Sequence, residues 1–124
     1  MINEINTLVL AYLGDAIYEY KIREYLINKK INKVDMLQKE SIKYVSATSQ
    51  SKILDSLLND NILTEEELEI VKKARNYKTN KHPKNTDLKT YKKATSLEVL
   101  IGYLYLNNNI KRIDFIIDII KRIV

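Results

Sequence analysis

Residues that interrupt helices are almost absent from this chain, and this scarcity constrains the fold more than any other feature of the sequence. Among 124 residues there are two glycines and one proline, against usual shares of about 7% and about 5%. The many isoleucines recur at helical spacing rather than in the alternation typical of strands. The sequence therefore predicts an all-α protein, a single compact domain over residues 1–124, with few turns and about six helices.

Capping residues and apolar spacing indicate where the helices begin and end. Thr64 followed by Glu67 is a capping box, and Asn32 and either Thr86 or Asp87 are the expected caps of two other helices. The six expected helices cover about residues 4–28, 34–39, 41–58, 64–76, 87–107 and 110–123. In the first of them we expect one apolar stripe to face the core, formed by Ile5, Leu8, Val9, Tyr12, Leu13, Ala16 and Tyr20.

Two acids stand alone inside uncharged, largely apolar stretches. Asp15 is the only charged residue between positions 5 and 18, and Glu98 is the only one between positions 94 and 110. Both stretches are predicted to be core helices, in which an unpaired carboxylate costs several kcal/mol. We therefore expect a cation to compensate each acid.

Small residues surround both acids. The two glycines of the chain are Gly14, next to Asp15, and Gly102, one turn after Glu98, and an alanine lies one turn before each acid. Such small residues let two helices approach closely and direct both carboxylates to one point. The first hypothesis is therefore a divalent metal ion held between two core helices. The residues alone leave a structural ion pair as the alternative.

The net charge of +5 is concentrated in one segment of the chain. Residues 72–93, called the basic segment below, hold nine basic residues and a single acid, Asp87, together with the only histidine, His82. A segment of this kind can bind phosphate backbones through charge without reading their sequence. The alternative is a solvated, lysine-rich loop without a partner. We expect His82 to be an exposed loop residue with no catalytic role.

Several classes of protein are excluded by what the sequence lacks. There is no cysteine, which excludes disulfides, thiolate zinc sites and thiol nucleophiles. No apolar run approaches the roughly 18 residues of a membrane span, and no basic-then-apolar signal pattern opens the chain. The expectation is a cytoplasmic protein with no membrane association.

Two motifs resemble those of the ribonuclease III family. Residues 10–19 (LAYLGDAIYE) are similar to the signature helix of that family, and residues 94–106 (ATSLEVLIGYLYL) are similar to its other catalytic helix, where an acid precedes a leucine–isoleucine–glycine run. Between them, the pairs at 75–76 and 90–91, Lys78, and the PKNTD run at 83–87 follow the pattern of the Mini-III subclass, which consists of the catalytic domain alone. The similarity covers nearly the whole chain in the expected order.

This resemblance implies a Mg²⁺-dependent endoribonuclease that hydrolyses double-stranded or structured RNA as a homodimer. The subclass implies maturation of ribosomal RNA (the 23S precursor), with a ribosomal protein as a further partner. Asp15 and Glu98 match the catalytic acids that bind the metal. Larger family members carry acids at the positions of Ala11 and Thr95, so the resemblance implies a leaner metal site here, in which Thr95 acts through a water or an outer hydrogen bond.

RNA contacts are expected from the basic segment, at Arg75, Asn76, Lys78, Lys81, Lys84, Asn85, Thr86 and Tyr91. The alternative function is a non-catalytic, dimeric helical module that binds RNA or protein through this segment. The two lone acids favour the enzyme, because a binding module gains nothing from two buried carboxylates.

Overall fold

The computed structural model describes residues 5–79 and 81–124, and within these residues the chain forms six helices and no strand. The prediction of an all-α protein with about six helices is confirmed. The predicted start of the first helix, residue 4, lies outside the described residues. The helices are α1 (Thr7–Asn28), α2 (Val34–Val45), α3 (Ala47–Asn59), α4 (Glu65–Arg75), α5 (Leu88–Leu106) and α6 (Ile110–Ile123).

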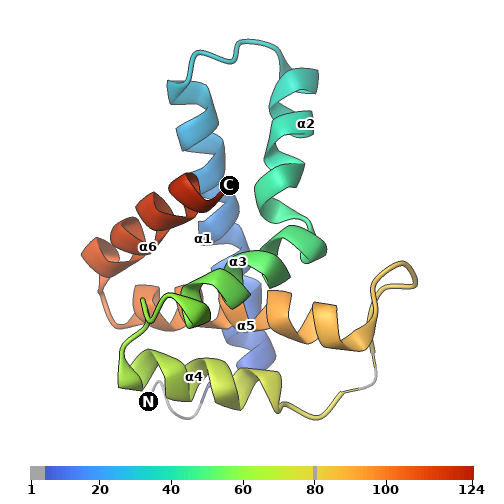
Figure 1. Cartoon of the computed structure of the whole chain (residues 1–124), viewed down its shortest axis with the longest axis vertical. Helices are drawn as coiled ribbons and strands as arrows, with labels where there is room; N and C mark the ends of the chain where they lie inside the picture. Colours follow the sequence, from blue (N-terminus) through green and yellow to red (C-terminus); the bar gives the residue numbers. More distant parts are fainter. Residues whose placement is uncertain (1–4, 80) are drawn as a thin grey trace.

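Helix α5 lies at the centre of the molecule and contacts most of the other helices (Figure 1). Its most extensive contact is with α1, which crosses it, while α3 and α4 pack along it. The C-terminal half of α1 extends beyond α5, with α2 on one side and α6 on the other (Figure 1). Large side chains with no exposed surface fill the space between these helices, among them Tyr18, Ile22, Leu54, Leu57, Leu97, Leu100, Ile101, Ile113, Ile116 and Ile120. No helix in the described part of the chain combines the length and apolarity needed to cross a membrane.

The caps of α4 and α5 are those expected from the sequence. The Thr64 side chain accepts a hydrogen bond from the backbone N–H of Glu67, and the Glu67 side chain accepts one from the backbone N–H of Thr64, which completes the capping box. At α5, the Asp87 carboxylate accepts from the backbone N–H of Thr90 at 2.8 Å, and this interaction holds the pKa of Asp87 below its ordinary value. Local capping chemistry therefore fixes the helices on either side of the basic segment.

The boundary between α2 and α3 differs from the prediction. The expected break near residue 40 is helical, and α2 continues to Val45. The break falls at Ser46, whose extended backbone (ψ 153°) and hydroxyl, accepting from the backbone N–H of Ser49, start α3. Asn32 is not a cap either, because Lys33 occupies the N-cap position of α2 without a side-chain hydrogen bond. Serine at 41 and serine at 46 offer similar local capping chemistry, so the packing of the helices selects between them.

The inward face of α1 also differs from the prediction. Of the expected stripe, Leu8, Val9, Tyr12 and Tyr20 are exposed, Tyr12 to 84%. The face that packs inward consists of Thr7, Leu10, Ala11, Gly14, Tyr18, Ile22 and Leu26. The helix is apolar on more than one side, so periodicity alone does not select the buried side. The close contact with α5 selects it.

Candidate active site

The site begins with a crossing of α1 over α5 that only glycine permits. A Cβ atom added at Gly14 would overlap the backbone carbonyl of Glu98, and one added at Gly102 would overlap the carbonyl of Leu10. The two backbones are therefore in direct contact at this point, closer than any pair of larger residues allows. The close approach expected from the two glycines is present.

The crossing brings Asp15 and Glu98 together, one from each helix. Burial raises the pKa of Glu98 to about 8, and the charge of the neighbouring Asp15, which hydrogen-bonds to it, adds to that effect. Glu98 is half-buried, whereas Asp15 is exposed. We expected both carboxylates to be buried. This expectation is wrong for Asp15, because Gly14, and not Asp15, lies on the side of α1 that contacts α5.

The chemistry of this pair fits a hard divalent cation. Two carboxyl groups that share a hydrogen bond compete with each other for ionisation, and a cation between them relieves that repulsion. Within the described residues, no group of three or more acidic, histidine or cysteine side chains is placed to hold a metal. A site of two carboxylates suits Mg²⁺, which keeps several of its waters in proteins.

The two positions at which the resemblance to the ribonuclease III family would place further acids are closed to solvent. Ala11 and Thr95 are 7% and 8% exposed and lie one turn before Asp15 and three residues before Glu98. Within the described residues, Thr95 is not among the groups that shift the pKa of Glu98. Thr95 thus lies one turn from Glu98 on the same helix, without a hydrogen bond to that carboxyl.

A residue that the sequence analysis missed, Gln50, also reaches this site. It lies in the first turn of α3, is 3% exposed, and its carboxamide lies beside Glu98, where it lowers the pKa of that carboxyl against the effect of burial. Its Nε2 atom has no hydrogen-bond partner. The Ser46–Ser49 capping pair that starts α3 is the sequence signal that could have placed Gln50 on a buried first turn.

The predicted RNA-binding residues lie along the surface between α4 and α5. Of these, Arg75, Asn76, Lys78, Lys81, Lys84 and Asn85 are exposed, whereas Thr86 and Tyr91 are half-buried. His82 is exposed, and its ring Nδ1 lies 2.6 Å from the carbonyl of Thr86 and 3.0 Å from that of Pro83. Both of these carbonyls belong to the loop that carries the histidine.

The cationic surface also includes lysines of α5 that were not singled out beforehand. Lys89, Lys92 and Lys93 follow at helical spacing and line a hollow of about 420 Å³ together with Arg75 and Leu88. One of them, Lys93, is already paired with Asp55 at 3.1 Å. Lys89 and Lys92 thus extend the basic surface from the loop onto a helix whose position is fixed by the core.

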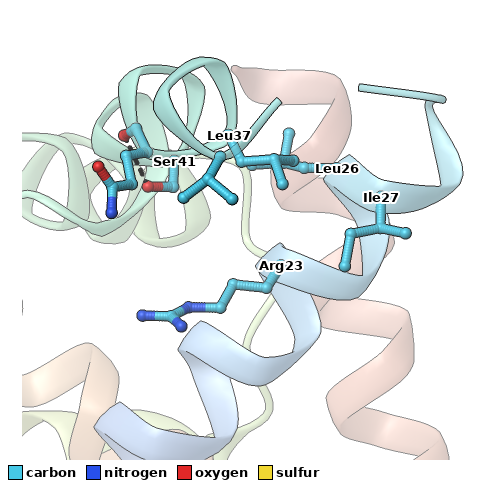
Figure 2. A pocket seen from close by; sticks show the side chains of 7 residues that line it. Arg23, Leu26, Ile27, Leu37 and Ser41 are labelled. Carbon is cyan, nitrogen blue, oxygen red and sulfur yellow. Dashed lines mark hydrogen bonds between the residues drawn. The ribbon is translucent and has the colours of Figure 1, made fainter. Parts of the chain in front are cut away.

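A second hollow, of about 280 Å³, opens between the C-terminal half of α1 and α2 (Figure 2). It is mostly apolar and contains no carboxylate, so it offers no metal-binding chemistry. Its one charged group, Arg23, is paired with Glu19 on the same helix at 3.0 Å. The hollow is lined by Arg23, Leu26, Ile27, Val34, Leu37, Gln38 and Ser41.

The chain is similar in sequence to known proteins over nearly its whole length. Residues 8–109 match the family described as Ribonuclease III domain. The chain is 40% identical to a Mini-ribonuclease 3 of Staphylococcus aureus over 120 residues, covering 97% of this chain and 90% of the relative. It is 45% identical to a Mini-ribonuclease 3 of Brevibacillus brevis over 116 residues, covering 94% of this chain and 85% of the relative.

A solved structure has the same fold. A protein of Fusobacterium nucleatum, known from an X-ray crystal structure, superposes with a TM-score of 0.84 at 37% sequence identity. The match covers 94% of this chain and 93% of the other. The six-helix arrangement is thus shared with an experimentally determined structure.

Proposed function

Since the chain belongs to the ribonuclease III family, we propose that Asp15 and Glu98 together hold the Mg²⁺ ion with which it cleaves RNA. The family consists of endoribonucleases that depend on a divalent metal and act on double-stranded RNA, and the chain is an endoribonuclease of this kind. The observation that carries the proposal is the glycine crossing, which places two carboxyl groups from different helices at one point.

The two acids have different tasks in this proposal. Asp15 is exposed and faces the solvent from which the RNA arrives, whereas the half-buried Glu98 fixes the cation against the core. A bound Mg²⁺ supplies a Lewis acid for the scissile phosphate and an acidified water as nucleophile. Thr95, behind Glu98, supports the site through a water or an outer hydrogen bond.

Binding of the duplex is assigned to the basic segment. Its exposed cations attract phosphates over the whole surface, while Lys89 and Lys92 present theirs from a rigid helix. The polar candidates Asn76, Asn85 and Thr86, with Tyr91, suit contacts to sugar hydroxyls and phosphates. A-form duplexes are recognised mostly by shape, phosphates and 2′-hydroxyls, so this surface selects duplex structure over sequence.

The exposed apolar face of α1 supports a homodimer. Leu8, Val9, Tyr12 and Tyr20 are 40%, 55%, 84% and 59% exposed, and a cluster of this kind is typical of an interaction surface. A second copy would cover it and bring two sites into one particle. Sedimentation velocity tests this: we expect a dimer for the wild type and a folded monomer for Tyr12→Asp, and a monomeric wild type would contradict it.

We further propose structured ribosomal RNA, the 23S precursor, as the natural substrate, with a ribosomal protein as helper. The support is the subclass resemblance together with a surface that recognises duplex shape rather than sequence. Cleavage mapping on precursor RNA, with and without ribosomal proteins, tests both parts. Cuts at scattered positions that no ribosomal protein alters would contradict them.

The decisive experiment is cleavage of a long duplex RNA with and without Mg²⁺, beside Asp15→Asn and Glu98→Gln. We expect Mg²⁺-dependent cutting that falls by at least about 100-fold in each variant. Wild-type binding to duplex RNA without cutting would favour the non-catalytic module. Cutting that survives both substitutions would remove these acids from the active site.

A further inference from the structure

The first turn of α3 contains a polar side chain that the fold leaves unpaired. Gln50 is 3% exposed, and its backbone N–H donates to the Ser46 carbonyl at 2.9 Å, so its position on the helix is fixed. Its Nε2 atom is shielded from solvent and has no hydrogen-bond partner. A buried donor without a partner costs about 1–3 kcal/mol, which the fold bears without any structural return.

The neighbour of this unpaired donor is Glu98. Helix α3 packs along α5, and the Gln50 carboxamide lies near enough to the Glu98 carboxyl to lower its pKa. An unused N–H donor thus stands beside one of the two carboxyl groups at the helix crossing.

We propose that Gln50 is a positioning residue, whose Nε2 donates to the ionised Glu98 carboxylate and holds it toward the point that it shares with Asp15. This inference rests on the proposed function of the two acids. The Gln50 N–H that has no partner in the metal-free fold would then gain one when the metal is bound. It donates to one oxygen of Glu98, and the other oxygen stays free for the cation.

A neutral amide suits this position better than a charged donor. A lysine or arginine beside Glu98 would neutralise the carboxylate and repel the divalent cation, whereas an amide favours the ionised form without adding charge. Asp15 is exposed, so water stabilises its charge. The half-buried Glu98 is less accessible to water, and Gln50 is a protein donor that the described part of the fold brings near it.

The test replaces Gln50 by a residue of the same length without the amide. Gln50→Met removes the donor from the site and the unpaired group from the core. We expect the affinity for Mn²⁺, measured by isothermal titration calorimetry, to fall about 10-fold. The melting temperature in EDTA should stay equal or rise. With duplex RNA at a fixed, subsaturating Mg²⁺ concentration, kcat should fall while KM is unchanged, and added Mg²⁺ should restore part of the loss.

Gln38→Met is the matched control, since Gln38 is an exposed glutamine on α2, and it should leave all three measurements unchanged. A Gln50→Met protein that binds Mn²⁺ and turns over like the wild type would overturn the proposal. Asp15→Asn and Glu98→Gln distinguish a failure of the proposed metal site from a failure of the role proposed for Gln50. If both bind Mn²⁺ as tightly as the wild type, the metal site itself is wrong, whatever Gln50 does.

The wild type provides a test that does not depend on the folding of a variant. In ¹H–¹⁵N spectra, the assigned side-chain amide of Gln50 should shift and exchange more slowly with solvent when Mg²⁺ is added, while that of Gln38 should not. An amide signal of Gln50 that is unaffected by saturating Mg²⁺ would contradict the proposed hydrogen bond.

Discussion

In the proposed reaction, the helix crossing and the basic segment contribute by different physical means. At the crossing, backbone atoms of α1 and α5 touch, and the two acids follow from the position of the helices. In the basic segment, exposed cations lie along a loop and the edges of two helices. Metal-assisted hydrolysis needs groups in fixed positions, whereas attraction of phosphates depends mainly on total charge. We therefore expect substitutions to act steeply at the crossing and gradually in the basic segment.

The largest effect is expected for Gly14→Ala. In an exposed helix this change stabilises by about 1 kcal/mol, but here the new Cβ would overlap the Glu98 carbonyl. We expect the free energy of unfolding to fall by about 2–4 kcal/mol and cleavage to be lost, as measured by urea denaturation and duplex RNA cleavage. Gly102→Ala should behave alike. A variant with wild-type stability and activity would show that the backbone contact does not fix the site.

The next effect, which appears only above the ordinary pKa of a carboxyl group, concerns the pH dependence of stability without metal. Because the pKa of Glu98 is raised to about 8 in the folded state, the folded protein resists ionisation of this carboxyl. The unfolded chain ionises near the ordinary value of about 4.3, so stability falls as pH rises from there to about 8 and no further above it. Glu98→Gln removes this loss.

Urea denaturation in EDTA at pH 5 and pH 8.5 measures the effect. We expect Glu98→Gln to exceed the wild type by roughly 2–4 kcal/mol at pH 8.5 and by much less at pH 5. Mg²⁺ should narrow the difference by stabilising the wild type alone. If the two proteins differed in stability by the same amount at both pH values, burial would not oppose the ionisation of Glu98.

In the basic segment we expect graded losses. Lys89→Gln combined with Lys92→Gln should weaken binding to duplex RNA about 10-fold, lower the slope of log K against log salt by about 2, and leave kcat at saturating RNA unchanged. Lys78→Gln combined with Lys84→Gln should give a smaller loss, since the loop can rearrange. Lys39→Gln, exposed on α2, is the control. A collapse of kcat in either double variant would contradict the division of roles.

The smallest effect is expected for His82→Ala. Within the described residues, the hydrogen bonds of its ring are to carbonyls of its own loop, so the rate of cleavage should change by less than about 2-fold and the shape of the pH–rate profile should stay the same. If one limb of the pH–rate profile disappeared in the His82→Ala variant, His82 would take part in the chemistry.

How much could be predicted from the sequence differs between features set by local chemistry and features set by packing. Two caps set by local chemistry are confirmed, the Thr64–Glu67 capping box and Asp87, one of the two residues expected to cap α5. The close approach of the two helices at the glycines is confirmed as well. The two caps depend on residues within one turn of each other. The close approach of the helices depends on glycine, which has no side chain.

Two other features set by packing were not predicted. The inward side of α1 was wrong because the helix is apolar on several sides, and the α2–α3 boundary was wrong because two serines could begin a helix. The second error hid Gln50, whose burial follows from that boundary. The assignments of Asp15 and Glu98 to the metal, and of the basic residues to RNA, remain predictions.

The contact between Gly14 and Gly102 also matters for anyone who wishes to redesign this enzyme. The distance between the two acids is set by the contact of two main chains. Side-chain substitutions therefore cannot adjust this distance in small steps. Variation of the RNA surface is therefore open to a library of mutants, while the spacing of the acids can be altered only by rebuilding both helices. Changes of substrate preference should be sought at the first lysines of α5, Lys89 and Lys92, and in the loop before them, and the crossing should be left as it is.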